Sequence, residues 1–152
     1  MAESFKSRLT RWKFNLFPVY RRTGARLTYI SGDLREVQIK LPLNWKTRNY
    51  VGTLFGGSMY AAVDPLYMVM LINILGPKYI VWDKEASIKF IKPACSTVHA
   101  KAKIPKSEID YIRNTLKAQK KLERTYQIEL TDEAGNVCAV VEKIIHFKKK
   151  HE

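Results

Sequence analysis

One segment constrains the fold more than any other: residues Ser58 to Leu75 are apolar on nearly every side. A helix with apolar side chains all round is buried rather than amphipathic. The segment contains Asp64, Pro65 and Asn73, which make it too short and too interrupted for a good transmembrane helix. The pair Gly76-Pro77 ends it. We therefore expect one long helix at the centre of the domain, with the other elements packed around it.

Alternating apolar and polar residues predict strands on both sides of this helix. Two strands precede it, at 25–29 and 36–41, with the turn Ser31-Gly32-Asp33 between them. Four strands follow it, at 80–90, 98–104, 122–130 and 137–147, and a short surface helix is expected at 106–118. An antiparallel sheet with one face on the central helix would bury both patterns, so the predicted class is α+β. One helix covers only part of such a sheet, and we expect a second subunit to complete it.

Size and charge limit the remaining possibilities. The 152 residues suffice for one domain. Lys and Arg number 27 against 14 Asp and Glu, a net charge of +13 that favours nucleic acid, a membrane surface or a phosphorylated small molecule as partner. Two cysteines without a C-x-x-C pattern argue against disulfides and structural zinc, and the histidines (His99, His146 and His151) lack metal-ligand spacing. With no secretory signal pattern, a reducing, cytoplasmic location is expected.

The first 24 residues form a basic segment distinct from the main domain at 25–152. Between Ser4 and Tyr20, Phe5, Leu9, Trp12 and Leu16 follow helical spacing with basic residues between them, and a proline at position 18 ends the helix or lies just past it. Three interpretations stay open. The helix packs on the main domain, it lies on a membrane surface through residues 4–20, or it is a transit peptide, against which Glu3 counts.

Three features could carry chemistry. Gly56-Gly57 opens the buried helix, where unpaired N–H groups and the helix dipole can bind a carbonyl oxygen that gains negative charge; the alternative is a tight, closely packed turn. Asp64 is a lone carboxylate in an apolar helix, and Asp64-Pro65 is equally a good N-cap pair. Asp83 lies on the polar parity of a strand and is expected in solvent, but near Asp64 it would suit acid–base chemistry.

Two sequence blocks resemble a known family. The first block resembles the signature of hotdog-fold acyl-CoA thioesterases of the phenylacetyl-CoA (PaaI-like) branch. It consists of Asn49-Tyr50-Val51-Gly52-Thr53-Leu54-Phe55-Gly56-Gly57, followed by Val63-Asp64. The second block is similar to a bacterial thioesterase-like group of unknown function that carries G-T-L-F-G-G and V-W-D-K motifs. It runs from Tyr79 to Lys84 and from Ala86 to Pro93. The resemblance covers roughly residues 25–147. It implies a hotdog fold, an antiparallel sheet wrapped on one long central helix, here with an extra N-terminal helix.

The resemblance also implies roles for single residues. Gly56 and Gly57 would supply the N–H that polarises the thioester carbonyl, and Asp64 would be the nucleophile or the base that activates water. Asn49 would help to position the reacting groups. Asp83 occupies the place of a serine or threonine that touches the attacking water from the partner subunit. The site would form across a homodimer or homotetramer interface, with CoA as part of the substrate and no further cofactor.

One residue departs from the family pattern, because Phe55 stands where the usual histidine would touch the substrate. Either the histidine is dispensable or the protein binds an acyl thioester without cleaving it. Lysines near the sheet edge, Lys89, Lys92, Lys101 and Lys103, could hold the CoA phosphates or simply be solvated. Three hypotheses follow: an acyl-CoA thioesterase, a non-catalytic acyl-CoA or lipid-binding module, and a basic protein that binds nucleic acid or membrane, for which no nucleic-acid motif is present.

Overall fold

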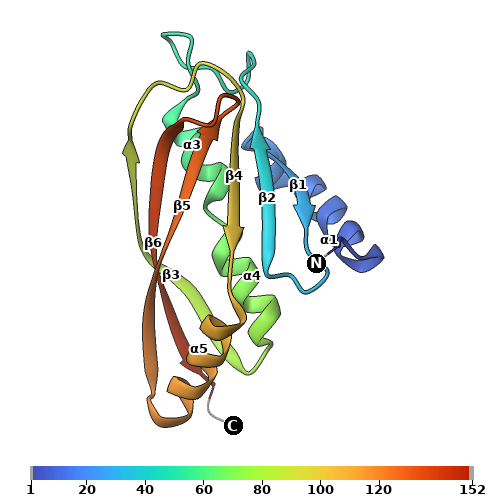
Figure 1. Cartoon of the computed structure of the whole chain (residues 1–152), viewed down its shortest axis with the longest axis vertical. Helices are drawn as coiled ribbons and strands as arrows, with labels where there is room; N and C mark the ends of the chain where they lie inside the picture. The colour runs from blue at the N-terminus through green and yellow to red at the C-terminus, as the bar shows by residue number, and fades with distance from the viewer. Residues whose placement is uncertain (1, 151–152) are drawn as a thin grey trace.

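The computed structural model describes residues 2–150, so the histidine at position 151 lies outside the described residues. Helices and strands occur where hydrophobic periodicity predicts them (Figure 1). The helices are α1 (Phe5–Leu16), α2 (Pro18–Arg22), α3 (Gly56–Val63), α4 (Leu66–Leu75) and α5 (Lys106–Ala118). The strands are β1 (Arg26–Ile30), β2 (Glu36–Leu41), β3 (Tyr79–Phe90), β4 (Val98–Lys103), β5 (Lys121–Asp132) and β6 (Val137–Lys149).

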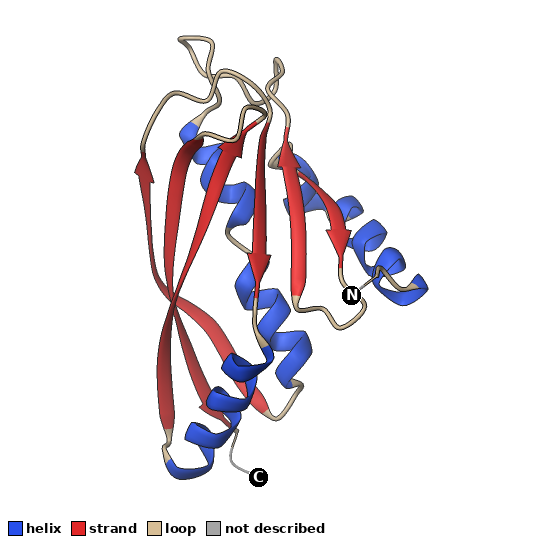
Figure 2. Ribbon diagram, in the orientation of Figure 1, coloured by secondary structure: helices blue, strands red, loops and turns tan. Residues whose placement is uncertain are grey.

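All six strands join one antiparallel sheet in the order β1-β2-β4-β5-β6-β3, so β1 and β3 are its edges. Helices α3 and α4 follow one another along one face of the sheet, and α5 lies at one end (Figure 2). Alternation along the strands turns the apolar residues toward α3 and α4. Fully buried side chains of the core include Ile39, Leu41, Val63, Leu71, Val141, Ile145 and Phe147. The predicted antiparallel sheet on a long central helix is therefore confirmed.

The central helix is interrupted at Asp64-Pro65, between α3 and α4. Proline lacks the N–H that would continue the hydrogen-bond ladder. Asp64 has helical backbone angles (φ −47°, ψ −50°) at the end of α3, and no side chain caps α4. The N-cap interpretation of Asp64 is therefore wrong, and its carboxylate is available for other contacts. By length and composition alone the 20-residue run Gly56–Leu75 could span a membrane, but its buried side chains pack in the core of this fold.

Strand β3 contains a bulge, after which the residue positions that face inward and outward along the strand are exchanged. The register against β6 shifts between Asp83 and Glu85, so Lys84 is an extra residue. Before the bulge Val81 is buried and Trp82 is exposed. Asp83 shares the inward parity of Val81, and the expectation that Asp83 faces solvent is wrong. A single strict alternation through 80–90 does not anticipate the extra residue.

The N-terminal helices pack at the β1 edge of the sheet, where Figure 1 shows α1 beside β1. The Asn15 side chain accepts a hydrogen bond from the Leu27 N–H at 2.8 Å and donates one to the Leu27 carbonyl at 3.0 Å. Tyr20 is buried and donates its hydroxyl to the Ala62 carbonyl at 3.0 Å. The expected position of Pro18 is also found, because it is the first residue of α2 and follows the end of α1. These contacts tie the segment to the main domain.

Candidate functional site

A fully buried lysine joins the two carboxylates that the sequence singled out. Lys143 Nζ lies 2.8 Å from Asp64 Oδ1 and 2.6 Å from Asp83 Oδ2, and it also donates to the Asp64 carbonyl oxygen. Asp64 comes from the break between α3 and α4, Asp83 from β3 just before the bulge, and Lys143 from the inward face of β6. A buried charge is tolerated when it is paired and hydrogen-bonded. Two carboxyl groups thus share one buried lysine beside the central helix.

Asp64 presents a free carboxylate oxygen from this cluster. Tyr60 donates its hydroxyl to Asp64 Oδ1 at 2.7 Å, so this oxygen receives hydrogen bonds from both Tyr60 and Lys143. Burial, reinforced by the bond to Asp64, raises the pKa of the Tyr60 phenol, which therefore keeps its proton and remains a donor. The Asp64 side chain is 44% exposed, and within residues 2–150 no hydrogen bond engages its Oδ2. One oxygen is held in place, and the other faces outward.

Asp83 has an unsatisfied oxygen. Its Oδ2 is bound by Lys143, but its Oδ1 is buried with no hydrogen-bond partner among the described residues. Buried acceptors without a partner are rare because they lose hydration without compensation. Asp83 lies on an edge strand, β3, but its Oδ1 is on the buried face of that strand. The chain therefore leaves one buried acceptor unsatisfied.

The two glycines lie at the first turn of α3 and are covered by aromatic rings. A Cβ on Gly56 would lie 2.7 Å from the Phe90 ring, and one on Gly57 would lie 2.5 Å from the Phe55 ring. The close-packing alternative therefore holds for both positions. Their N–H groups are still unpaired within the described chain, because the first helical bond is donated by the Met59 N–H to the Phe55 carbonyl. The turn combines tight packing with free donors.

A groove of about 420 Å³ runs beside this turn. It contains three of the predicted site residues, and its lining is Asn49, Thr53, Leu54, Gly56, Met59, Phe90, Ile91, Lys92, Pro93 and Ala94. The Asn49 amide is fully used inside its loop: Oδ1 accepts from the N–H groups of Val51 and Thr53, and Nδ2 donates to Thr53 Oγ1 at 2.8 Å. Asn49 thus shapes the wall of the groove.

The predicted phosphate-binding lysines are not brought together within one chain. Lys92 lines the groove and pairs with Asp132 at 3.1 Å. Lys101 lies on β4 and pairs with Glu36 of β2 at 2.9 Å. Lys89 is exposed near the end of β3. Because β5 and β6 separate β4 from β3, these strands are about 14 Å apart. Lys89 shares strand β3 with Asp83, and Lys92 follows the end of that strand.

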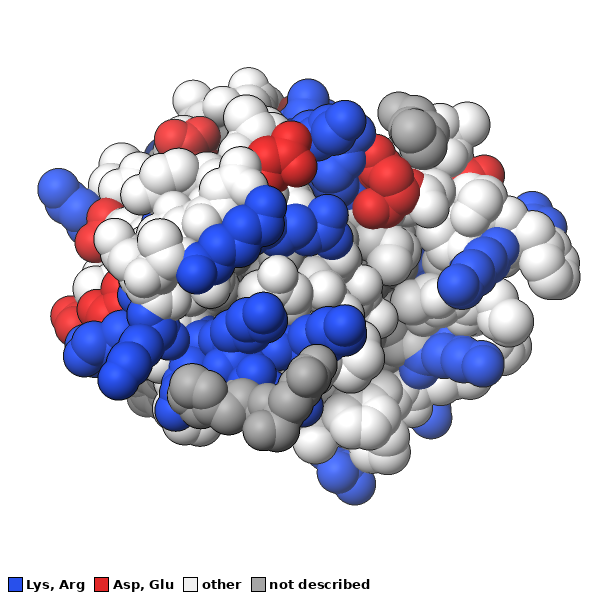
Figure 3. Space-filling model, turned by 90° about the horizontal axis from the view of Figure 1, so that it is seen from below, with Lys and Arg blue, Asp and Glu red and all other residues white. Residues whose placement is uncertain are grey.

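Much of the positive charge gathers elsewhere. A hollow of about 640 Å³ at the α5 end of the molecule is lined by Lys78, Lys117, Lys120, Lys149 and Lys150 together with uncharged residues. Figure 3 views this end and shows Lys and Arg gathered on it. Figure 1 places it at the opposite end from the start of α3. These lysines explain part of the net charge without contributing to the groove.

Sequence reasoning missed Lys143 and the role of Tyr60. A signal for Lys143 was present, because it occupies the apolar parity between Val141 and Ile145 on a buried strand. An ionisable residue at such a position needs an opposite charge nearby. Tyr60 lies four residues before Asp64, one helical turn away, which allows their contact. Neither pattern identifies Asp83 as the second carboxylate.

The site residues form two groups that one chain holds apart. Gly57 and Asp64 are seven helical residues apart, which is about 10 Å along the axis. A nucleophile and an oxyanion donor must both lie about 3 Å from the reacting group. The geometry therefore prevents the glycine N–H and the Asp64 carboxylate of the same chain from acting on one carbonyl group.

Solved structures with the same fold come from several bacteria. A protein of unknown function from Pseudomonas aeruginosa, described as a probable thioesterase, has a TM-score of 0.84 and 18% identity, covering 99% of this chain and 100% of its own. A protein of unknown function from Chlorobaculum tepidum has a TM-score of 0.76 and 16% identity, covering 95% of both chains. A thioesterase from Haemophilus influenzae has a TM-score of 0.70 and 15% identity, covering 99% of this chain and 95% of its own.

At these identities the likeness establishes the fold, which is the hotdog fold expected from the sequence. No curated protein sequence matches the chain significantly. A family profile matches residues 6–146, which include most of the N-terminal segment and nearly all of the sheet. On this match, the chain belongs to the family described as a domain of unknown function, DUF4442.

Proposed function

We propose that the protein hydrolyses an acyl-CoA thioester to the free acid and CoA. The observation that carries the proposal is the Asp64 carboxylate, with one oxygen held by Lys143 and Tyr60 and the other facing outward. Such a carboxylate is fixed in orientation yet accessible, as a nucleophile or general base must be. The shared fold with proteins named as thioesterases from Pseudomonas aeruginosa and Haemophilus influenzae adds support.

In the simpler version of the chemistry, Asp64 acts as a general base. Its free oxygen takes a proton from water, and the resulting hydroxide adds to the thioester carbonyl carbon. The first-turn N–H of Gly56 or Gly57 donates to the oxygen as it gains negative charge. The C–S bond then breaks, and the CoA thiolate recovers the proton from Asp64. In the alternative version Asp64 itself attacks the carbonyl carbon, and the C–S bond breaks to release the CoA thiolate. Water then hydrolyses the resulting anhydride, which restores Asp64, frees the acid and supplies the proton that the thiolate takes up.

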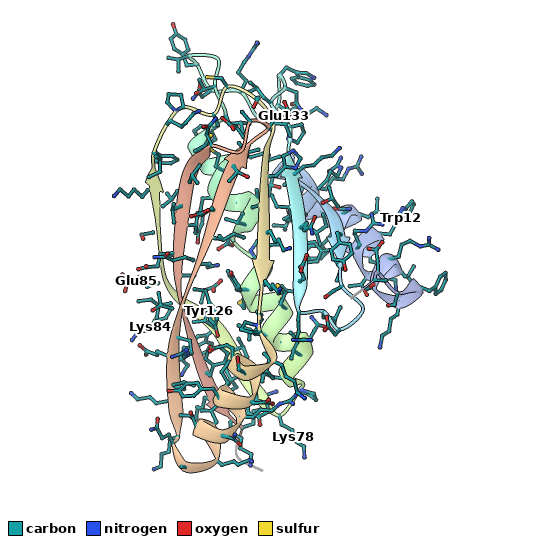
Figure 4. The ribbon with its side chains drawn as sticks, viewed as in Figure 1. Trp12, Lys78, Lys84, Glu85, Tyr126 and Glu133 are labelled. Atoms are coloured by element: carbon teal, nitrogen blue, oxygen red, sulfur yellow. The ribbon has the colours of Figure 1, made fainter. Side chains whose placement is uncertain are left out.

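A complete site requires two copies of the chain in this proposal. Within one chain the glycine N–H groups and Asp64 are too far apart, so each site takes the glycines of one copy and Asp64 of the other. Strand β3 supports this arrangement, because it is a 12-residue edge strand whose outer side is largely exposed. Figure 4 shows Lys84 and Glu85 on this open edge. Pairing of two β3 strands would give a homodimer, which could associate further into a tetramer.

Substrate recognition follows from the groove. Lys92, which lines the groove, and the exposed Lys89 would meet the CoA phosphates near one end of β3, while Lys101 would contribute only from another copy. Apolar groove residues such as Met59 and Phe90 suit an acyl chain. Asp83 would contribute through Lys143, which it binds together with Asp64, because its remaining oxygen is buried. The reaction needs no metal or further cofactor, and we propose the cytoplasm as its location.

A second candidate function is binding of an acyl thioester without cleavage. Phe55 favours it, because a phenyl ring covers Gly57 where a histidine would offer a hydrogen bond. In this case the groove would hold the acyl-CoA, and the carboxylate cluster would only stabilise the fold. The two candidates differ in product formation, not in ligand class.

Thiol release from short, medium, long and aromatic acyl-CoAs tests the proposal. We expect turnover by the wild type and a loss of at least about 10²-fold in Asp64→Asn, which removes the base but keeps the side-chain size. Asp110→Asn, on the exposed surface of α5, is the matched control and should retain full activity. Retained turnover in Asp64→Asn would refute the mechanism. Tight acyl-CoA binding by calorimetry without turnover would establish the second candidate instead.

A further inference from the structure

Six large apolar residues are exposed along α1, at the junction that follows it and on α2, and we call them the outer face. Their exposed fractions are 77% for Phe5, 47% for Leu9, 63% for Trp12, 51% for Leu16, 58% for Phe17 and 69% for Val19. In Figure 4 Trp12 projects outward from α1. Single exposed apolar residues are ordinary, but a contiguous group of this kind indicates an interaction surface.

The residues of the outer face are not the ones by which α1 packs on the rest of the domain. Ser7 is buried, and the Asn15 amide bonds both backbone groups of Leu27. Phe14 packs against Tyr20, with ring centroids 4.8 Å apart. At 100° per residue, Ser7 and Phe14 lie on the side of α1 opposite Trp12. The inner side thus supplies the attachment to the sheet, and the apolar stripe stays largely exposed.

Positive charge surrounds the outer face. From Ser4 to Gly32 the chain has no acidic residue, and its basic residues there are Lys6, Arg8, Arg11, Lys13, Arg21, Arg22 and Arg26. On the helix, Lys6 and Lys13 flank one side of the stripe and Arg8 flanks the other, where its guanidinium lies 5.9 Å from the centre of the Phe5 ring. Glu3 is already paired with Arg11 at 2.7 Å. The surface combines apolar insertion groups with uncompensated cations.

We propose that the outer face of α1 and α2 docks onto an anionic phospholipid surface. Aromatic and aliphatic side chains on one side of a helix insert at the boundary between headgroups and acyl chains, while flanking Lys and Arg extend to the phosphates. A second copy of this chain fits less well, because a symmetric contact would bring the two sets of cations together. Since α1 lies at the β1 edge, docking leaves the β3 edge and its carboxylate cluster free. The proposal does not depend on catalysis.

Co-sedimentation of the full chain with lipid vesicles tests this proposal. We expect binding to vesicles of equimolar phosphatidylcholine and phosphatidylglycerol, weakened about tenfold or more for phosphatidylcholine alone. Trp12→Ser should weaken binding to the anionic vesicles about tenfold. The matched control is Trp45→Ser, since Trp45 is 79% exposed and lies beside Lys46 in a loop distant in sequence from α1. In a variant with Trp45→Phe and Trp82→Phe, vesicles should shift the remaining Trp12 emission to shorter wavelength.

Other outcomes would overturn the proposal. If Trp12→Ser and Trp45→Ser change vesicle binding equally, the outer face has no specific role in lipid binding. If the wild type does not bind vesicles and Trp12→Ser lowers its mass in sedimentation velocity, the outer face is a contact between copies. If the wild type binds a short DNA duplex but no vesicles, the basic residues around the outer face bind nucleic acid. Leu9→Ser, measured beside Trp12→Ser with circular dichroism on both, guards against an effect of misfolding.

Discussion

At position 143 the chain places a lysine where strand alternation calls for an apolar side chain. The cost of burying this ammonium group is offset by two carboxylates and a backbone carbonyl. The arrangement does more than satisfy a charge, because it holds one oxygen of Asp64 and leaves the other free. Lys143 is therefore a positioning residue for the proposed chemistry: it acts through Asp64 and does not reach solvent itself.

Lys143→Met tests this role, because it keeps most of the length of the side chain, which becomes one heavy atom shorter, and removes the amino group. We expect a loss of roughly 3 kcal/mol in the free energy of unfolding, since two carboxylates are left without their partner. The kcat should fall about tenfold or more with little change in KM. Urea unfolding and steady-state kinetics measure both quantities.

Lys84→Met is the control for this change. Lys84 pairs with Glu123 on the surface, where solvent screening leaves an ion pair with little net effect on stability. It should leave both stability and kcat nearly unchanged. A kcat that survives in Lys143→Met would make the lysine purely structural.

The glycine N–H groups can be tested by a matched pair of substitutions. Gly56→Ala and Gly56→Pro both place a Cβ against the Phe90 ring, but only the proline removes the N–H. Proline suits this first helical position because Phe55 already has extended angles (φ −69°, ψ 128°). If this N–H is the oxyanion donor, kcat should fall about 10²-fold more in Gly56→Pro than in Gly56→Ala. Equal rates would exclude Gly56, and the same pair at Gly57 would test its neighbour.

At the scale of elements, the bulge in β3 decides which side chains meet. Lys84 adds one residue between two inward-facing stretches, so Val81 and Asp83 before it and Ile88 after it can all face the interior. Without it, strict alternation would turn Val81 and Asp83 to solvent. The break in the central helix also decides a contact. It separates α3 from α4 at Asp64-Pro65, and Asp64 is the residue that Lys143 binds.

Deletion of Lys84 should therefore be far more harmful than its substitution. The deletion forces the chain either to expose Val81 and withdraw Asp83 from Lys143 or to re-register β3, and we expect a loss of about 3 kcal/mol or more in unfolding free energy. Lys84→Ser keeps the bulge and loses only the surface pair with Glu123. Urea denaturation midpoints compare the two. Similar midpoints would show that the bulge is dispensable.

At the scale of the whole molecule, the sheet has two different edges. The β1 edge is covered by α1, whereas the β3 edge is open and carries Asp83. An open 12-residue edge strand offers unpaired backbone groups to another strand. The proposed catalytic groups also require two copies, since one chain separates Gly57 from Asp64 by about 10 Å.

Mixing two inactive variants tests this arrangement. Asp64→Asn and Gly56→Pro chains, unfolded together and refolded in equal amounts, should recover about a quarter of wild-type activity. Half of the dimers would then be mixed, and each mixed dimer would hold one intact site. Thiol release before and after mixing measures the recovery. Absence of recovery, with dimers confirmed by sedimentation, would place both groups of one site on the same chain.

Hydrophobic periodicity is a local property, and it is enough to predict the α+β class, the strands, the surface helix and the long central helix. Asp64, Asp83 and the Gly56-Gly57 turn also stand out along the chain. That Asp64 and Asp83 meet on Lys143 is visible only in the folded molecule. Residues 64, 83 and 143 are brought together by a helix break, an extra residue in an edge strand and the register between β3 and β6. These depend on contacts between segments distant in the chain, which no local pattern encodes.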